Sequence, residues 1–263
     1  MIARMLRVAG ALALSAHFLA AGSAVAAPKL DRGATERWPT AGSIVYRVDY
    51  GSAGLQIGEA HHAWTQDGKN YRMSLELRTT GAAALLHKLQ YTQRSEGSID
   101  ASGLRPRKFS VEQRGRANDA VSFDWQAAQA TIPRSGRQPR IVALAAGDQD
   151  VLSLWHQVHL LDVRALPLKL TVITNKRGKA ARVESVGAEK LRLPLGEVDA
   201  LRLRAQTEDD SMTIDIWLDR KRAMQPVRIR IVDDDGSVLD QQATEVKFGK
   251  DAAAVAPAGA GAR

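Results

Sequence analysis

The sequence contains no cysteine among its 263 residues. This absence excludes disulfides, thiolate catalysis and cysteine–zinc sites, and it excludes the lipidated cysteine of a bacterial lipoprotein. A chain of this length does not require disulfides, because larger domains bury enough apolar surface to fold without them. The lack of cysteine is therefore compatible with an oxidising compartment such as the periplasm.

Long apolar runs are also missing, except at the N-terminus. Arg4 and Arg7 precede an apolar run over residues 8–21, and small residues then continue to Ala26. A positive flank, a short apolar stretch and a small-residue cleavage site are typical of a secretory signal peptide. The run is shorter than the ~20 residues that span a bilayer as a helix. We predict a signal peptide over residues 1–26, a periplasmic location and no integral membrane segment.

Assembled catalytic motifs are absent as well. The sequence has no Gly-x-Ser-x-Gly nucleophile elbow and no His-Glu-x-x-His zinc motif. Glu59 and His61 lie two apart, share one face of a predicted strand and form a possible acid–base pair. His156, His159 and Asp162 follow a helical spacing that suits metal ligands, but no further ligand completes a site. We therefore predict no enzyme, no metal and no cofactor.

The chain is basic, with a formal net charge of +8. Basic residues interleaved with aromatic ones are concentrated between Arg105 and Arg140. Such a segment can bind single-stranded nucleic acid, but an exported protein meets lipopolysaccharide or other envelope polyanions instead. A solvated, charged outer sheet face explains the same residues without any ligand.

Strict apolar/polar alternation dominates the sequence. It is clearest over residues 213–219, where Ile214 and Ile216 share one face, and it returns over residues 226–232 and 238–248. Residues 44–78 repeat the pattern with two turn signals, residues 51–54 and the Asp-Gly pair at Asp67 and Gly68, and shorter strands follow to residue 134. This pattern predicts an all-β fold with one short helix, built as an antiparallel meander sheet that is strongly curved or forms an open half-barrel.

One segment follows a helical period instead. Apolar residues recur at three- and four-residue steps from Val151 to Leu161, and Asp148 and Asp150 precede them as possible caps. The sequence therefore predicts one helix packed against the sheet.

The domain organisation is simple. We expect a loosely held N-terminal arm over residues 27–42, a single β-rich domain over residues 43–248, and a disordered Ala/Gly/Pro tail over residues 249–263.

Several motifs, taken in order, resemble a bacterial family called domain of unknown function 3108. They are Tyr46–Tyr50 with Leu55–Ala60, Gly147–Leu154, Leu193–Glu197, and Ile216–Asp219 followed by Pro226–Ile229. The resemblance covers the whole predicted domain and implies an exported, mostly antiparallel β protein. It implies no activity and no site residues.

The carboxylate pair Asp215 and Asp219 is of the kind that glycoside hydrolases use. Both residues face away from the Ile214 row, however, as do the neighbouring arginines, so cross-strand ion pairs and an arginine over Trp217 explain them without chemistry.

The favoured interpretation is a non-catalytic envelope module that holds an amphipathic or anionic envelope molecule, or a partner protein, on its curved apolar face. The alternatives are a carboxylate hydrolase of envelope glycan or lipid, and a structural envelope protein that binds a partner chain. Nucleic acid is not expected as a partner. The predicted ligand or partner contacts are Trp217, Arg228, Arg230, Trp155, His156 and His159.

Overall fold

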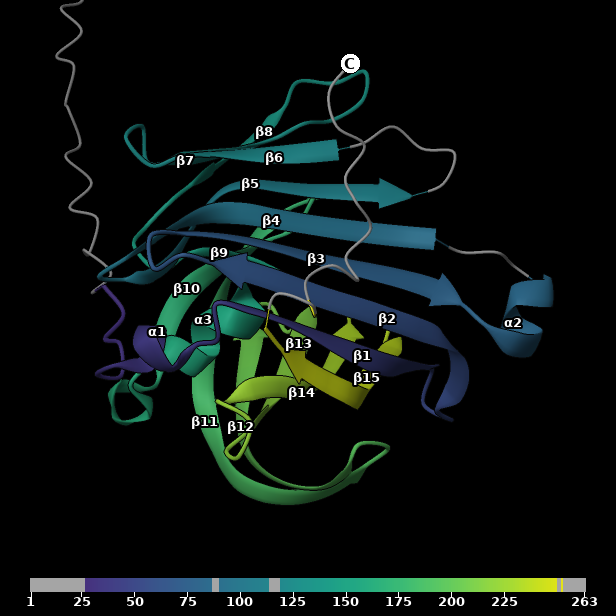
Figure 1. Cartoon of the computed structure of the whole chain (residues 1–263). Coiled ribbons are helices and arrows are strands. Elements are labelled where there is room, and N and C mark those ends of the chain that lie inside the picture. The colour runs from purple at the N-terminus through teal and green to yellow at the C-terminus, as the bar shows by residue number, and fades with distance from the viewer. Residues whose placement is uncertain (1–26, 87–89, 114–118, 250–251, 253–263) are drawn as a thin grey trace, which may run out of the picture.

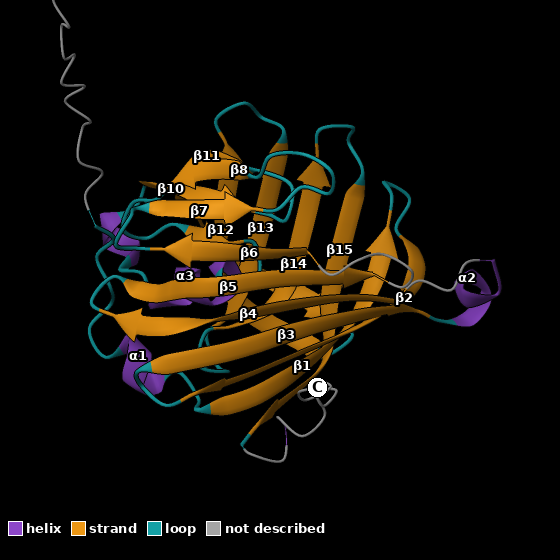
Figure 2. Cartoon of the chain, turned by 90° about the horizontal axis from the view of Figure 1, so that it is seen from above, coloured by secondary structure: helices purple, strands orange, loops and turns teal. Residues whose placement is uncertain are grey.

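All the strands form one continuous sheet. The structure is a computed structural model that describes residues 27–86, 90–113, 119–249 and 252, and it contains a fifteen-stranded sheet in the order β8-β7-β6-β5-β4-β3-β2-β1-β15-β14-β13-β12-β11-β10-β9. The N-terminal strands are β1 (Ala41–Tyr50), β2 (Leu55–Gln66), β3 (Asn70–Thr79), β4 (Gln90–Asp100), β5 (Gly103–Gln113), β6 (Asp119–Asp124), β7 (Gln129–Ile132) and β8 (Arg140–Ala143). The C-terminal strands are β9 (Gln149–Asp150), β10 (Leu168–Ile173), β11 (Gly178–Leu193), β12 (Gly196–Thr207), β13 (Met212–Asp219), β14 (Gln225–Asp233) and β15 (Val238–Phe248). Figures 1 and 2 show the sheet curving so that its two halves face each other.

The fold-class prediction is confirmed. Neighbouring strands pair antiparallel throughout, apart from the two-residue strand β9, which runs parallel to β10. The first strand β1 pairs with the last strand β15, so the two meanders become one sheet. The edge strands β8 and β9 do not pair with each other. The strongly curved sheet is therefore open and does not close into a barrel.

Apolar and polar residues that alternate along the sequence lie on opposite faces of the sheet, as a period of two predicts. Ile214 lies opposite Ile231 and Ile216 lies opposite Ile229 across β13 and β14. Ile214 and Ile216 are both buried on the inner side of the curved sheet. Between β14 and β15 the turn contains Gly236 with φ 79°, a left-handed conformation that glycine adopts without a steric penalty.

The predicted helix is confirmed as α3 (Leu154–Leu160). The carboxylate of Asp150 accepts hydrogen bonds from the backbone N–H groups of Leu152 and Ser153, which belong to the turn that leads into the helix. The N-cap residue of α3 is Ser153, and no side chain caps the helix, so the expected aspartate cap is not present. Every residue of α3 is buried, whereas the sequence pattern predicts a single buried stripe. The reason is its position inside the curved sheet, where it contacts β5, β9 and β14.

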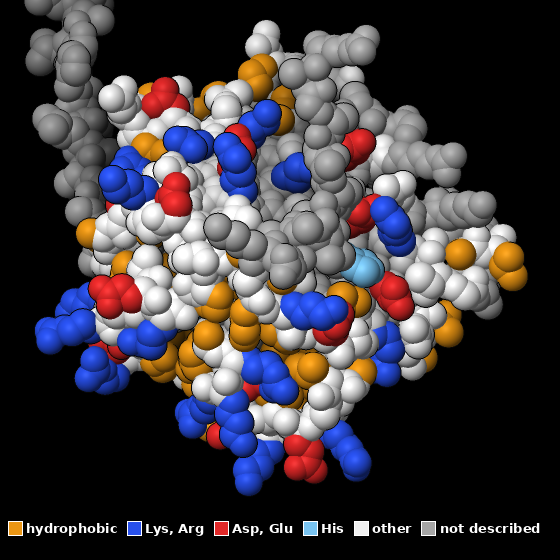
Figure 3. Space-filling model, in the orientation of Figure 1, with side chains coloured by type: hydrophobic (Ala, Val, Ile, Leu, Met, Phe, Trp, Pro, Cys, Tyr) orange, Lys and Arg blue, Asp and Glu red, His pale blue; other side chains and the backbone are white. Residues whose placement is uncertain are grey.

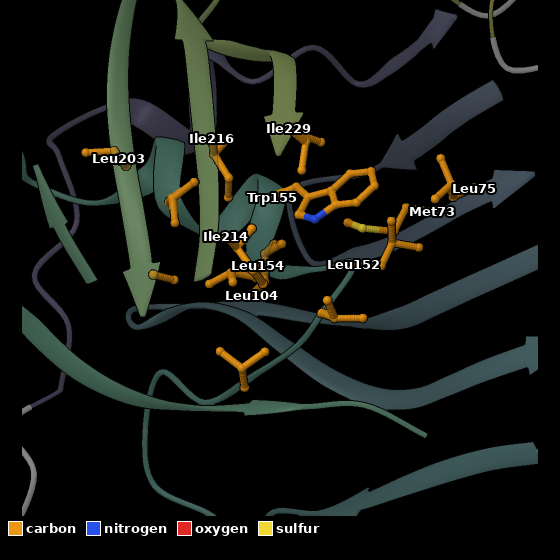
Figure 4. Packing of buried hydrophobic residues seen from close by; sticks show 14 of the residues in the cluster. Met73, Leu75, Leu104, Leu152, Leu154, Trp155, Leu203, Ile214, Ile216 and Ile229 are labelled. Atoms are coloured by element: carbon orange, nitrogen blue, oxygen red, sulfur yellow. The ribbon is translucent and has the colours of Figure 1, made fainter. Parts of the chain in front are cut away.

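The centre of the inner face is packed with side chains. Figure 4 shows Trp155 of α3 between Ile216 and Ile229 on one side and Met73 and Leu75 on the other. All five belong to one buried hydrophobic cluster. Any ligand space inside the curve must therefore lie toward its ends.

Three short helical segments complete the fold: α1 (Ala34–Arg37), α2 (Gly81–Leu86) and the 3-10 helix η1 (Val163–Ala165). The segment expected to be a loosely held arm contains α1, and it buries Ala34 and Trp38 in the core. The predicted signal peptide lies outside the described residues, as does the predicted tail apart from Gly249 and Ala252. None of the described helices is long and apolar enough to cross a membrane.

Candidate functional site

Three of the predicted contact residues lie in a buried cluster of aromatic and imidazole rings. We call it the histidine–tryptophan cluster; it consists of Trp38, His62, Trp64, Trp155, His156 and His159. Strand β2 contributes His62 and Trp64, which lie two apart and therefore point to the same face. Helix α3 contributes three members, and Trp38 follows α1. All six side chains are buried.

The hydrogen bonds of His62 and His156 define their tautomers. His62 Nδ1 lies 2.8 Å from the backbone carbonyl oxygen of Ser74, so this nitrogen carries the proton and donates it. His62 Nε2 is then an acceptor, and it lies 2.8 Å from His156 Nε2, which must donate. The remaining His156 Nδ1 is an acceptor that is buried without a hydrogen-bond partner.

His159 is more isolated. Both of its ring nitrogens are buried, and neither has a hydrogen-bond partner among the described residues. Its ring packs edge-on against Trp38 and His156, with each pair of ring centroids 5.5 Å apart. Burial lowers the pKa of His159 to about 3, and the nearby positive charge of Arg37 adds to the effect. His159 is therefore a neutral imidazole with a free donor and a free acceptor.

The other two histidines of the cluster are neutral for the same reason. Burial lowers the pKa of His62 to about 4, and burial together with the neighbouring His62 and His159 lowers the pKa of His156 well below its ordinary value. Asp162 does not join them, because its carboxylate pairs with Arg164. Within the described ranges no group of three or more metal-ligating side chains has a geometry that could hold a metal ion.

A cavity adjoins His159. Its volume is about 330 Å³, and it lies between α1, α3, the middle of β12 and the end of β13. We call it the His159 cavity. Its apolar wall consists of Val158, Leu161, Leu201, Leu218 and Met224, and its charged lining residues are Asp31, Arg37, Asp162, Arg164 and Arg220. In Figure 3, hydrophobic side chains gather on this face below the position of α1 and α3, with Lys and Arg side chains around them.

The charges at this cavity do not cancel. Arg37 pairs with Asp31 and Arg164 pairs with Asp162. Arg220 is exposed and forms no ion pair with a described residue. The lining therefore carries one positive charge in excess, next to an apolar wall and an imidazole with free hydrogen-bonding groups.

The other three predicted contacts lie on the opposite face of the sheet. Trp217 is buried between two guanidinium groups, with Arg202 4.8 Å and Arg228 4.6 Å from its ring centroid. Its indole N–H donates to Glu189, at 2.7 Å. The predicted arginine over Trp217 is therefore present, and a ligand on this face would meet guanidinium groups before the ring.

The ion pairs on the outer face are cross-strand, as expected, but β12 supplies the arginines for the central aspartate. Arg202 and Arg204 both donate to the carboxylate of Asp215. Arg228 pairs with Asp240 of β15 in a bidentate arrangement. Arg230 lies opposite Asp215 in the register of β13 and β14. The six predicted contacts thus form two groups on opposite faces, and their role in binding stays a prediction.

Glu59 and His61 lie on one face of β2, 3.8 Å apart between Oε2 and Nε2. The Glu59 side chain is exposed and the His61 side chain is half-buried, and a surface pair of this kind has a weak interaction. Neither residue lines any of the cavities formed by the described part of the chain, so the geometry adds nothing that favours the hydrolase alternative.

Sequence reasoning missed one buried polar network. Asp150 accepts a hydrogen bond from Ser95 Oγ at 2.6 Å, and Tyr71 Oη lies 3.2 Å from the same hydroxyl. Burial raises the pKa of Asp150 to about 6, although the hydrogen bonds from Ser95 and Ser153 oppose this shift. The sequence singles out Asp150 only as a possible helix cap, because its contact with β4 depends on pairing between distant strands.

Comparisons with known proteins give a family and distant fold likenesses. The chain belongs to the family described as "Protein of unknown function (DUF3108)", whose model matches residues 45–243. No curated protein matches.

Three solved structures illustrate the distant likenesses. A beta-barrel-like protein of domain of unknown function DUF1849 from Brucella abortus is 9% identical, with a TM-score of 0.48 over 81% of this chain and 99% of that one. A candidate lipoprotein from Parabacteroides distasonis is 10% identical, with a TM-score of 0.36 over 80% and 98% of the two chains. A candidate exported protein with a YmcC-like fold from Bacteroides fragilis is 10% identical, with a TM-score of 0.32 over 78% and 95%.

Proposed function

We propose that this DUF3108 protein is a non-catalytic periplasmic binding module that holds an anionic amphiphile of the cell envelope in the His159 cavity. The observation that carries the proposal is His159, a buried imidazole with two unpartnered nitrogens at the wall of an apolar cavity. Buried polar atoms are normally hydrogen-bonded, and each unsatisfied one has a desolvation cost of ~1–3 kcal/mol. A ligand oxygen that accepts from His159, once the ring has turned a nitrogen toward the cavity, removes part of this cost.

The size and lining of the cavity match a single medium-length acyl chain. A volume of 330 Å³ lies at the lower end of the range for ligand sites, and it accommodates roughly ten non-hydrogen atoms at the ~30 Å³ that one water occupies in the liquid. The chain would pack against Leu201, Leu218 and Met224. Its anionic group would lie at the charged rim, where Arg220 has no ion-pair partner among the described residues and Arg37 lies near His159.

The first experiment is native mass spectrometry of the mature protein, purified gently from periplasm without denaturant. We expect an extra mass that organic solvent removes, and an extract in which an acyl chain with an anionic group is identified. A bare polypeptide mass, together with no binding of added decanoate, would contradict the proposal and favour a partner-binding role.

The second experiment measures decanoate binding by isothermal titration calorimetry with matched variants. His159→Phe keeps a ring but removes both nitrogens, and we expect it to weaken binding about tenfold, because a hydrogen bond to a charged group contributes ~1.5–3 kcal/mol. Arg220→Glu should weaken binding to a similar extent. Arg134→Glu makes the same charge change in an exposed loop outside the cavity lining, and it should leave binding unchanged.

A further inference from the structure

A second cavity lies at the opposite end of β13 from the His159 cavity. Its volume is about 740 Å³, and Met212 at the start of β13 lines it, whereas Leu218 near the end of that strand lines the His159 cavity. We call it the turn cavity, because the turn at residues 174–177 and the turn after β14 form its rim. Arg140 of β8 donates to the backbone carbonyl of Lys176 at 2.9 Å and so connects one end of the sheet to this rim.

The floor of the turn cavity is apolar. It consists of Phe109, Val111, Val151 and Met212, with the partly buried Tyr91 beside them. One polar side chain lies beside this floor: the amide oxygen of Gln93 is buried without a hydrogen-bond partner, while its amide N–H donates to Tyr91. An apolar floor next to charged turns suits a ligand that is mainly apolar and has a charged group at one end.

The rim carries charges of both signs. Arg177 and Asp234 form an ion pair at 3.5 Å. Among the described residues, neither Arg140 nor Lys176 has an ion-pair partner, and Asp233 has no cationic partner either. The rim therefore carries two cations without an ion-pair partner and one aspartate, Asp233, which accepts a hydrogen bond from the backbone N–H of Ser237 and has no cationic partner among the described residues.

We infer that the turn cavity binds a zwitterionic phosphoethanolamine amphiphile, with its phosphate at Arg140 and Lys176, its ammonium at Asp233, and its acyl chains on the apolar floor. A simple anionic ligand would leave Asp233 close to its own negative charge, and a simple cation would face the two free cations. A phosphoethanolamine group matches both signs. Its ammonium also has three N–H donors for carboxylate and amide oxygens, which a quaternary amine lacks.

The volume agrees with this class of ligand. At ~30 Å³ per water-sized group, 740 Å³ accommodates roughly 25 non-hydrogen atoms, the size of a phosphoethanolamine headgroup with two short acyl chains. This inference is independent of the proposed function, because it uses a different cavity with different lining residues.

The test uses the mature full chain and dihexanoyl-phosphatidylethanolamine below the concentration at which it forms micelles, measured by isothermal titration calorimetry. We expect saturable binding of one molecule. We also expect at least about tenfold weaker binding of the phosphatidylcholine analogue, which has no ammonium N–H, and of the phosphatidylglycerol analogue, which has no positive charge. Equal affinity for all three lipids, or no saturable binding, would overturn the inference.

Variants locate the site. Lys176→Glu should weaken binding about tenfold, whereas Lys190→Glu makes the same charge change near the far end of β11 and should have no effect. Met212→Trp should block the floor without affecting decanoate, and Val163→Trp should obstruct the His159 cavity without affecting the phosphatidylethanolamine. Unfolding midpoints of the variants check that each one is folded. Lipid binding that survives Met212→Trp but is lost in Val163→Trp would refute the turn cavity as the site.

Discussion

At the scale of single residues, the most unusual feature is the number of buried neutral histidines. His62, His156 and His159 lie inside an aromatic cluster, and burial lowers the pKa of each. A histidine whose pKa is lower in the folded state takes up its proton more readily in the unfolded chain. The free energy of unfolding therefore falls as the pH drops through the window between the ordinary value of 6.5 and the lowered folded value.

Two buried acidic residues of the same region change the free energy of unfolding in the opposite direction as the pH falls. Burial raises the pKa of Asp150 to about 6, and burial also raises the pKa of Asp148. These carboxyls bind protons more readily in the folded protein, so their contribution to stability is present at low pH and is lost as the pH rises through the folded pKa. The pH dependence of the whole protein is thus a difference between two opposing groups, and single variants are needed to separate them.

His159→Phe should flatten the acid side of the stability curve. Between about pH 6 and pH 4, His159 binds about one more proton in the unfolded chain than in the folded protein. Without this imidazole, the slope of the unfolding free energy against pH should therefore fall by ~1.4 kcal/mol per pH unit. Urea unfolding at several pH values measures this slope. His61→Phe is the control, because it makes the same substitution at a half-buried histidine of β2 that lies outside the histidine–tryptophan cluster. An unchanged slope in His159→Phe would show that this ring is not buried as described.

At the scale of secondary-structure elements, close contact between strands explains individual glycines. Gly58 of β2 lies at the irregularity where the register of β1 and β2 shifts. A Cβ atom at this position would lie 2.0 Å from the backbone carbonyl oxygen of Arg78 on β3. Because the obstructing atom belongs to a paired strand, it cannot move aside as a flexible side chain can.

Gly58→Ala should therefore destabilise the protein by ~1–3 kcal/mol or more, through backbone displacement. Gly51→Ala is the matched control: Gly51 has φ 75°, and a Cβ atom added there would have no neighbour within 4 Å, so only the conformational cost of a left-handed alanine remains. Urea unfolding of both variants gives the comparison. A loss of stability in Gly58→Ala no greater than that in Gly51→Ala would contradict the packing argument.

The elements also show where local patterns fail. In the sequence, apolar/polar alternation covers residues 182–186 and again residues 191–195, whereas the structure contains one sixteen-residue strand, β11. The register shifts between Ser185 and Gly187, and this irregularity interrupts the alternation that sequence reasoning follows. The strand continues because β12 pairs with it on both sides of the shift.

At the scale of the whole molecule, the pairing of β1 with β15 unites the two meanders. The buried hydroxyl of Tyr46 on β1 donates to the backbone carbonyl oxygen of Pro226 on β14, at 2.5 Å and across 180 positions of sequence. On the same strand, the exposed hydroxyl of Tyr50 donates to Ser237 Oγ at 3.1 Å. The two tyrosines therefore offer the same chemical change in buried and exposed settings.

Tyr46→Phe should lower the free energy of unfolding by ~1–3 kcal/mol, because it leaves the buried carbonyl of Pro226 without its partner. Tyr50→Phe should change it by less than ~0.5 kcal/mol, as surface substitutions usually do. Thermal and urea unfolding of the two variants measure how much the buried hydrogen bond stabilises the connection between the two halves of the sheet. Equal effects of the two substitutions would show that this hydrogen bond does not contribute to the connection.

Local sequence was sufficient to predict the β class, the main hairpins and the existence of one helix. Each follows from short-range rules: alternation around Ile214 and Ile216, the Asp-Gly signal at Gly68, and the helical period of the apolar residues from Val151 to Leu161. The family resemblance also came from contiguous motifs. These features are readable because their causes lie within a few residues of one another.

The places where these elements meet depend on long-range packing instead. The hydrogen bond between His62 and His156 joins residues 94 apart in sequence, and no local pattern specifies it. The same holds for the enclosure of α3 within the sheet, the docking of Trp38 and the two end cavities. They arise from the curvature of a sheet joined through β1 and β15, in which distant residues become neighbours because burying their apolar surface stabilises the curved sheet.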